Sequence, residues 1–581
     1  MSLRTVLPAL CFSIAFSAAI AQTSDPPAKP EPAKPEPAKS EPAKSDGSKP
    51  DAARPAVREI PPDAKAYSEA VGKKDLDQRI EALTRFKADF PDSEMRSVAD
   101  SAILSAILHK QPQDLARART HAAEMYRSAP LKDRGSLANN IATLFLDNGV
   151  LLKDAERYAT KSVDSMRLSG YMDEQLAAAK KRKGQPPSPE ELQKRFRESR
   201  ASRLATLGRI EVKLGHVAKG QKMLEEVYAI TPANIPALAT LGELAAKSGD
   251  DAKAMQYLIP ARLSGHPDKD AQLAFEGVYR KTHGSLDGMD AMLDAEYRKR
   301  YPNPLTLEAY KPSEKRSDRM VLAEVFTGSG CPPCVAADLA FEAAMERYSR
   351  KELAVVMYHQ HIPRPDPMTN PDTQARAKSY SVNGVPTFVI DGKKSSGGGP
   401  RETTKNVYNR FDKDLEKDLE TPAEAHLAAE ASLAGNSVRV HAAVDGVKSE
   451  SADLKVQVLL IEKELHYAGE NGIRFHPMVV RAMGGEKGAG FALASKGGSY
   501  DQAFDLEEVS KALKAHLDDY EAKGHRGESF TFLEKKDRIN RANLAVVVFV
   551  QDDKSKHVLQ AAYIDLGQET TRPATDANGL R

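Results

Sequence analysis

Two cysteines three positions apart offer the clearest chemistry in this chain. They stand in a Cys-Pro-Pro-Cys segment, between a β-prone run at Met320–Phe326 and a segment of helical periodicity at Val335–Tyr348. A cysteine at the start of a helix is activated as a nucleophile, because unpaired amides and the helix dipole stabilise its thiolate. A second cysteine one turn further on can resolve a mixed disulfide. The sequence therefore predicts a redox-active disulfide in which Cys331 attacks and Cys334 resolves.

Two other roles for this pair stay open at the level of sequence. A Cys-x-x-Cys pair can form half of a zinc site, and His359 and His361 are histidines that could supply the other half. The pair can also be a purely structural bridge, although closing so short a loop removes little chain entropy. The third cysteine, Cys11, lies in the apolar N-terminal stretch. A zinc site of two cysteines and two histidines is not a common design where a strand, a Cys-x-x-Cys pair and a helix follow one another, so we expect no metal and no cofactor at the pair.

The N-terminus has the pattern of a secretory signal peptide, which we place at residues 1–21. Arg4 supplies a positive charge, Val6–Ile20 is mostly apolar, and a small-x-small cleavage pattern ends at Ala21. Cleavage there would remove Cys11 and leave one pair of cysteines. No later run has the roughly 18 apolar residues of a membrane helix. We expect an exported, periplasmic protein without a transmembrane helix in its mature chain; the alternative is an uncleaved anchor.

Two terminal segments of the chain are expected to be disordered. Residues 22–60 are rich in Pro, Lys and Glu, and we expect a disordered, partly polyproline-II linker there, which is either a tether or a tail without a partner. Residues 571–581 are expected to be a disordered tail.

The charges of the chain are nearly balanced. It has 84 Lys and Arg against 82 Asp and Glu, a net charge of +2. This balance gives no reason to expect nucleic acid or a membrane surface as a partner.

Residues 61–300 are helical and repetitive, with a period of 34 residues. The positions that recur are Leu204, Leu207, Gly208, Gly215, Leu224 and Val227, followed by Leu238, Leu241, Gly242, Gly249, Leu258 and Ala261. This pattern resembles the tetratricopeptide repeat, in which paired helices stack because neither buries its apolar face alone. Glu211 and Gly220 depart from the family, which has a large aromatic residue and an alanine there. The resemblance implies an α-solenoid that binds a protein or peptide partner, or one that only spaces the next domain.

Strands alternate with helices in residues 305–422. Further β-prone runs lie at Leu353–His359 and Thr387–Ile390, and further helical segments at Thr373–Tyr380 and Thr403–Leu419. This alternation predicts an α/β domain with a parallel or mixed sheet and helical cover. The cysteine pair then falls between the first strand and the first helix of the domain.

The Cys-Pro-Pro-Cys segment and the Gly-Val-Pro-Thr-Phe segment at 384–388 together resemble the thioredoxin superfamily. The resemblance covers about residues 319–420. It implies that the peptide bond before Pro386 is cis and that this proline packs beside the cysteines. It also implies that the backbone of Val385 offers hydrogen bonds to a substrate strand.

Three positions near the pair depart from the thioredoxin pattern or add to it. Gly330 stands where thioredoxins usually have tryptophan. The family has a buried acidic residue that relays protons to the second cysteine, and Glu324 is the nearest match, one residue farther away than the family spacing; it is otherwise a solvent-facing strand residue. His361 is either an imidazolium that lowers the pKa of Cys331 or an ordinary loop histidine.

Residues 425–570 are predicted to form a C-terminal β-sandwich-like domain. The strand-like runs are Val438–Val444, Leu454–Ile461, Ala542–Val550 and Val558–Leu566, and a charged helical insertion lies near Leu506–Ala522. The segment Phe475–Arg481, together with the strand before the cysteines, also resembles the outer-membrane-protein-28-related group. In that group a thioredoxin-like module precedes a β-sandwich. No catalytic pattern is visible in this region.

The sequence thus predicts a multidomain protein with an α-solenoid, an α/β thioredoxin-like domain and a C-terminal β-sandwich. The first functional hypothesis is an extracytoplasmic thiol–disulfide oxidoreductase that acts on protein thiols and disulfides, with a partner bound to the helical repeats. The second is a non-enzymatic interaction scaffold. Whether the pair reduces, oxidises or isomerises substrates depends on its redox potential, which the sequence does not give.

Overall fold

A computed structural model describes residues 61–181, 185–265, 268–493, 497–525 and 530–566. The predicted signal peptide at 1–21, the linker at 22–60 and the tail at 571–581 lie outside the described residues. Among the helices of the described part, none combines the length and the apolar character needed to cross a bilayer.

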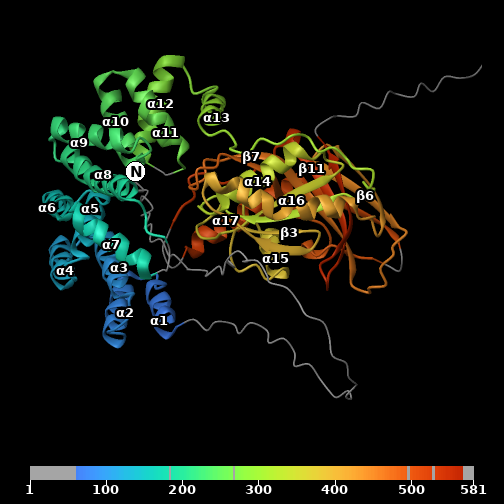
Figure 1. The fold of residues 1–581 in the computed structure, drawn as a ribbon, viewed down its shortest axis with the longest axis horizontal. Coiled ribbons are helices and arrows are strands. Elements are labelled where there is room, and N and C mark those ends of the chain that lie inside the picture. Colours follow the sequence, from blue (N-terminus) through green and yellow to red (C-terminus); the bar gives the residue numbers. More distant parts are fainter. Residues whose placement is uncertain (1–60, 182–184, 266–267, 494–496, 526–529, 567–581) are drawn as a thin grey trace, which may run out of the picture.

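The N-terminal region consists of helices that pack in consecutive pairs. They form an arc beside an α/β body, drawn from blue to green in Figure 1. The helices are α1 (Pro62–Val71), α2 (Leu76–Asp89), α3 (Arg96–His109), α4 (Leu115–Ser128), α5 (Arg134–Asp147), α6 (Leu152–Ser165), α7 (Leu168–Lys181), α8 (Pro189–Lys213), α9 (Val217–Ile230), α10 (Ile235–Ser248), α11 (Asp251–Leu263), α12 (Lys269–His283) and α13 (Met289–Arg300). This arrangement confirms the expected helical repeat region.

The two copies of the 34-residue repeat each form a pair of helices, α8 with α9 and α10 with α11. Glycines let the two helices of each pair approach closely. A Cβ atom on Gly208 would lie 3.0 Å from Leu224 Cγ, and one on Gly242 would lie 2.5 Å from Leu258 Cγ. The recurrence of Gly and Leu at this spacing therefore marks the contact between paired helices.

The rest of the chain is built from strands with helices on their faces. The strands are β1 (Val321–Thr327), β2 (Leu353–His359), β3 (Thr387–Ile390), β4 (Lys393–Ser396), β5 (His426–Ala434), β6 (Ser437–Asp445), β7 (Leu454–His466), β8 (Phe475–Met483), β9 (Phe491–Ala492), β10 (Gly498–Asp505), β11 (Leu544–Asp552) and β12 (Val558–Asp565). The helices are α14 (Cys334–Arg347), α15 (Pro371–Ser379), α16 (Thr404–Glu420) and α17 (Leu506–Lys523). Most predicted segments of this region agree with these elements.

A large mixed sheet has the strand order β12-β11-β7-β8-β2-β1-β3-β4, with β9 paired to β7. β1 runs parallel to β2 and antiparallel to β3. β8 joins β2 at the pair Met357 and Val479, so strands from the C-terminal region extend the sheet that holds the cysteines. The sheet therefore crosses positions 422–425, where we had placed the junction between two domains.

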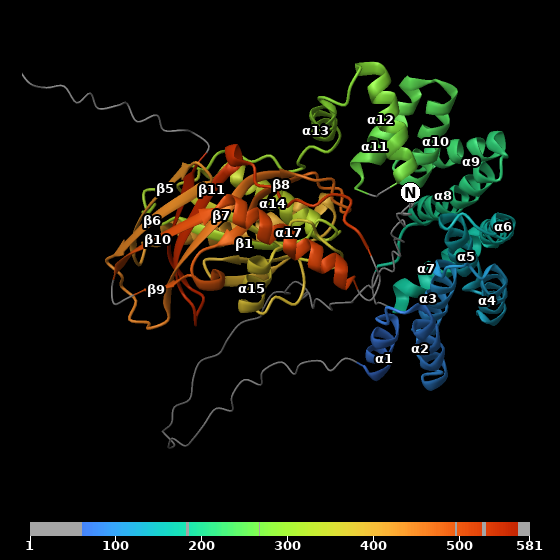
Figure 2. The ribbon, with the colours of Figure 1, turned by 180° about the vertical axis from the view of Figure 1, so that it is seen from behind.

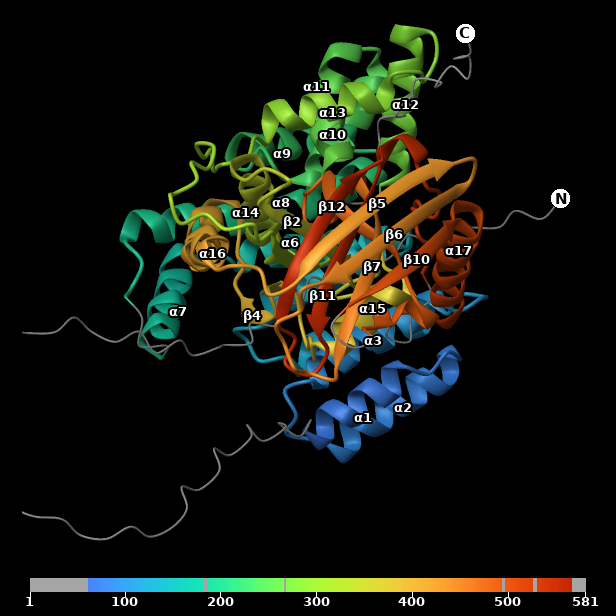
Figure 3. The same cartoon turned by 90° about the vertical axis from the view of Figure 1, so that its right-hand side faces the viewer.

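A small antiparallel sheet, in the order β10-β6-β5, faces one part of the large sheet. Figure 3 shows its strands lying across β7 and β11. Buried residues of β6, such as Val440, share one apolar core with residues of β11, such as Val546 and Val548. The sandwich-like packing predicted for the C-terminal region is therefore present, and one of its two layers belongs to the large sheet.

The two faces of β1 are covered by different helices, so side chains on the two faces of this strand have different neighbours. Phe388 of β3 packs with Phe341 of α14 and Phe411 of α16, so these two helices cover one face. On the other face, Phe326 of β1 packs against Tyr358 of β2, together with a tyrosine that follows α15. Because side chains alternate along a strand, neighbouring residues of β1 point to opposite faces.

Candidate active site

The two cysteines form a disulfide at the junction of β1 and α14, with Cα atoms 5.3 Å apart. A short turn, residues 328–331, leads into the pair, and we call it the cysteine turn. The amide of Cys331 donates to Gly328 O at 3.0 Å, and that of Cys334 donates to Cys331 O at 3.1 Å. Both sulfurs are bonded to each other, so neither is free to bind a metal in this state. The predicted placement between a strand and a helix is confirmed.

The first amides of α14 are already used by backbone carbonyls. The helix begins at Cys334, and Val335 N donates to Pro332 O at 3.4 Å. Ala336 N donates to Gly399 O at 3.1 Å. The expected unpaired amides are thus occupied in the oxidised protein, and the helix dipole is the contribution that remains to stabilise a thiolate at Cys331.

The segment with Val385 and Pro386 lies beside the disulfide. The peptide bond between these two residues is cis, and Cys331 Sγ lies 3.7 Å from Val385 O. A Cβ atom on Gly398 would lie 2.6 Å from Pro386 Cγ and 2.3 Å from Pro333 O, so this glycine touches both halves of the site. The structure thus brings together the cysteines, the cis proline and the residue before it.

The disulfide is buried although two of its neighbours are exposed. Cys331 is 1% exposed and Cys334 is 0% exposed, whereas the prolines between them face solvent. The β7–β8 loop, residues 467–474, lies against the turn before the disulfide. Asn471 N donates to Ser329 O at 3.0 Å, and Asn471 Nδ2 lies 3.4 Å from Cys331 O. No local pattern marked Asn471, because its contact with the turn spans about 140 residues of sequence.

Glu324 lies on the opposite face of β1 from α14. It is fully buried and forms an ion pair with Arg376 of α15, with Nε 2.7 Å from Glu324 Oε1. Tyr358 and Tyr380 donate hydrogen bonds to the same carboxylate at 3.0 and 2.5 Å. Glu324 is therefore neither a solvent-facing residue nor a neighbour of the cysteines. Its carboxylate instead joins α15 to the sheet.

Asp338 is the buried acid on the cysteine side of β1. It lies on α14 one turn after Cys334, and residues at this spacing share a helix face. Thr327, the last residue of β1, donates to Asp338 Oδ1 at 2.7 Å. Burial raises the pKa of Asp338 to about 7. The sequence signal was an aspartate within the apolar face of the predicted helix at 335–348, which sequence reasoning missed.

His361 does not carry the charge that would activate Cys331. Burial lowers the pKa of His361 to about 3, so the ring is neutral near pH 7. Its Nδ1 accepts a hydrogen bond from Asp366 N at 3.0 Å. The side chain of Asp366 accepts from Ser329 N at 2.6 Å and lies 2.9 Å from His359 Nδ1. Both histidines proposed as zinc ligands thus bond to this aspartate.

Asp366 keeps its negative charge beneath the cysteine turn. Burial alone would raise its pKa, but the nearby imidazole of His359 and the hydrogen bonds from His359, Ser329 and Met368 hold that pKa well below its usual range. The carboxylate therefore fixes the turn through the amide of Ser329.

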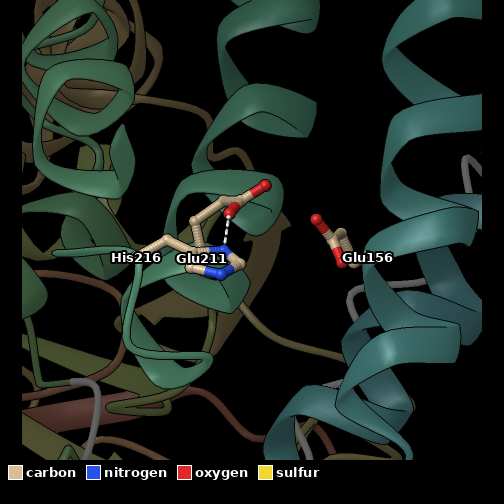
Figure 4. A group of neighbouring side chains, drawn as sticks. All are labelled: Glu156, Glu211 and His216. Atoms are coloured by element: carbon tan, nitrogen blue, oxygen red, sulfur yellow. Dashed lines mark hydrogen bonds and ion pairs between the residues drawn. The ribbon is translucent and has the colours of Figure 1, made fainter. Parts of the chain in front are cut away.

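One group in the helical repeats has the residue types of a metal site. Glu156, Glu211 and His216 place ligand atoms within 4.8 Å of one another (Figure 4). However, Glu211 already accepts from His216 Nδ1 at 2.7 Å and from Lys219 Nζ at 2.5 Å. The lysine ammonium thus supplies the positive charge that a metal ion would bring, and we assign no cation here. These contacts explain how a glutamate is buried at position 211.

The arrangement as a whole gathers four of the five residues predicted for the site. Cys331, Cys334, Val385 and Pro386 meet at one end of the sheet, and Glu324 does not join them. A disulfide at a strand–helix junction, next to a cis proline, is able to exchange with thiols that reach it.

Comparison with protein-family models and with curated proteins found no match to this chain.

Proposed function

We propose that this protein is a thiol–disulfide oxidoreductase with a thioredoxin-like active site. The observation that carries the proposal is the Cys331–Cys334 disulfide, which lies at the start of α14 with the cis peptide of Val385 and Pro386 beside it. A structural staple gains little from so short a loop, whereas a redox cycle requires two cysteines this close.

In the reducing direction, the Cys331 thiolate attacks one sulfur of a substrate disulfide. The substrate S–S bond breaks, and its other sulfur leaves as a thiolate that takes up a proton. Cys334 then loses its proton and attacks Cys331, which releases the first substrate sulfur and re-forms the disulfide of the pair. Two electrons pass to the substrate, and the same steps in reverse oxidise a substrate dithiol.

Asp338 is the group that we assign to the proton of Cys334. Its pKa of about 7 lets the carboxylate accept a proton and return it near neutral pH. Cys334 and Asp338 lie one helical turn apart on α14. We expect Asp338→Asn to slow the second step, seen as a longer-lived mixed disulfide, while the alkylation rate of reduced Cys331 stays unchanged.

The site of action and the partner are further parts of the proposal. A secretory signal at 1–21 would deliver the protein to the periplasm, where disulfides form and persist. The paired helices resemble tetratricopeptide repeats and would hold a protein substrate or a redox partner near the disulfide. Val385 would pair with the backbone of the substrate strand.

Reduction of insulin disulfides in the presence of dithiothreitol tests the activity with the full mature chain. We expect the wild type to accelerate the reaction and Cys331→Ser to be inactive. Cys334→Ser should trap a covalent mixed disulfide with the substrate, visible on a non-reducing gel. Equal rates for the wild type and Cys331→Ser would rule out the enzymatic function.

A scaffold with a structural disulfide is the second candidate, favoured by the burial of Cys331, which is 1% exposed. Titration of the pair against glutathione separates the two. A structural disulfide has a potential below about −300 mV, and the glutathione pool then fails to reduce it. A potential in the range of the known oxidoreductases would support the enzyme.

A further inference from the structure

Tyr297 connects the helical repeats to two loops that flank the disulfide. It lies in α13, which Figures 1 and 2 show between the other helices of the arc and the α/β body. Its hydroxyl donates to Gly472 O at 2.9 Å and accepts from Arg401 Nη2 at 3.3 Å. Gly472 belongs to the β7–β8 loop, and Arg401 ends a second loop, residues 397–401, which we call the glycine loop.

The β7–β8 loop is held on the cysteine turn by three kinds of contact. Asn471 bonds to the turn through both its backbone and its side chain. Ile473 is buried against Val335 and Leu339 of α14. A Cβ atom on Gly469 would lie 2.8 Å from Ser329 O, which shows how closely the loop approaches the turn.

The glycine loop covers the other side of the site. Gly399 N donates to Pro333 O at 2.8 Å, and Gly399 O accepts from Ala336 N, so this loop is bonded to the first turn of α14. Arg401, the last residue of the glycine loop, donates to the carbonyls of Tyr301 and Pro302, just after the end of α13. Both loops are therefore attached to the same end of one helix.

Tyr297 is at the same time part of the core of the repeats. It is 5% exposed and belongs to an apolar cluster with Leu293 of α13 and Phe275 of α12. Burial raises the pKa of Tyr297, so its hydroxyl stays protonated and remains a donor to Gly472. The position of this hydroxyl is thus set by the packing of α12 and α13.

A cavity lies beside the ends of the β7–β8 loop, at Tyr467, Ala468 and Arg474. It has a volume of about 250 Å³, lies between the repeats and the loop, and is also lined by Leu258 and Arg262 of α11. The middle of the loop, in contrast, packs against the repeats: a Cβ atom on Gly265 would lie 2.2 Å from Gly469 O. The repeats therefore contact the loop through its backbone as well as through Tyr297.

We propose that Tyr297 is a positioning residue that holds the β7–β8 loop and the glycine loop over the disulfide, so that α13 controls how readily thiols reach Cys331. The inference rests on the proposed function, because access matters only if the pair exchanges with substrates. It assigns to the last helix of the repeats a role in the reaction as well as in partner binding.

The test compares Tyr297→Phe with the wild type in the full mature chain. The ring keeps its edge contact with Phe475, and only the hydroxyl is lost. We expect the second-order rate of disulfide reduction by dithiothreitol to rise roughly five- to tenfold, as the loss of such hydrogen bonds implies. The rate of re-oxidation should rise by the same factor, so the potential against glutathione should be unchanged.

Tyr301→Phe is the matched control. It removes a phenolic hydroxyl just after α13 for which the described residues show no hydrogen bond, so its rates should equal those of the wild type.

Hydrogen exchange gives a second measurement. The amide of Asn471 should exchange faster in Tyr297→Phe, while amides in the middle of α14 should not. Unchanged reduction rates would overturn the proposal, and so would a rate increase accompanied by faster exchange throughout α14. Faster reduction without any insulin activity in the wild type would leave the control of access intact and refute the proposed function.

Discussion

At the residue scale, the two buried acids around β1 have opposite roles. Asp338 faces the cysteine side and accepts a hydrogen bond from Thr327, whereas Glu324 faces the other side and forms an ion pair with Arg376. The pKa of Asp338 is close to 7, whereas the carboxylate of Glu324 is part of a buried ion pair. Two buried carboxyl groups on opposite faces of β1 thus have different surroundings, and we propose a role in proton transfer only for Asp338.

The titration of Asp338 predicts a dependence of stability on pH. Because burial raises its pKa from 3.8 to about 7, the folded chain keeps a proton that the unfolded chain has lost between these two values. The contribution of this group to the free energy of unfolding is therefore fully present below about pH 4 and falls as the pH rises toward 7. Asp338→Asn should raise the urea midpoint at about pH 8 and leave it unchanged at about pH 4.

Thr327→Val is the control for this titration, since it removes the hydrogen bond and leaves the carboxyl group in place. Its pH dependence should persist. A difference between Asp338→Asn and the wild type that is the same at both pH values would contradict a raised pKa.

The buried ion pair of Glu324 predicts a stability effect without a redox effect. Glu324→Gln leaves the guanidinium of Arg376 buried without its counter-charge. Breaking a buried pair in this way costs about 3–5 kcal/mol of the free energy of unfolding, measured by guanidinium chloride denaturation. The potential of the cysteine pair should not change. If the variant were stable but altered the pH profile of insulin reduction, Glu324 would instead be the proton relay.

Local motifs made part of the site predictable. The cysteine pair follows from one short segment, and the cis bond before Pro386 follows from the resemblance of a second short segment to the thioredoxin superfamily. Asp338 could have been noticed as an aspartate within the apolar face of the predicted helix at 335–348, whereas Asn471 and Tyr297 became visible only in the fold. Their partners lie across the sheet, on another loop or on another helix, and nothing in the spacing of a single segment records such contacts.

At the element scale, two glycines that each lie inside a helix have different surroundings. Gly220 in α9 faces α8, and a Cβ atom there would lie 2.6 Å from Gly208 O and 2.9 Å from Val212 N. Gly277 in α12 is exposed, and a Cβ atom there would meet nothing within 4 Å. Glycine at 220 therefore allows a close approach of α8 and α9 that a side chain would block.

This contrast predicts opposite effects of the same substitution. Gly220→Ala forces a methyl group against backbone atoms and should lower the free energy of unfolding by about 1–3 kcal/mol. Gly277→Ala should raise it by about 0.5–1 kcal/mol, because alanine loses less backbone entropy in a helix. Thermal unfolding followed by circular dichroism measures both. Destabilisation by both substitutions would contradict the assigned surroundings.

Element boundaries were predictable where the pattern was strong. Leu353–His359 and Thr387–Ile390 coincide with β2 and β3, because short apolar runs bounded by turns are typical of buried strands. The partner of each strand was not predictable. The pairing of β8 with β2 joins segments more than a hundred residues apart, and an apolar pattern does not specify which edge a strand will meet.

At the scale of the whole molecule, the shared sheet determines what folds as a unit. The core around the cysteines includes Leu459 and Ile461 of β7 and Val547 and Phe549 of β11, alongside Phe326 and Phe341 from the α/β segment. The side chain of Gln551 in β11 also accepts from Arg376, within the polar network of Glu324. The α/β segment is therefore incomplete without the strands that follow it in sequence.

A truncation experiment tests this dependence. A fragment of residues 305–422 would expose β2 as an edge strand and leave one part of its apolar core without cover, which favours aggregation. We expect this fragment to be insoluble or to unfold without a cooperative transition. A fragment of residues 301–566 contains every strand of the large sheet and should unfold in one transition. Cooperative unfolding of the shorter fragment would mean that the thioredoxin-like segment folds on its own and that the C-terminal strands only extend its sheet.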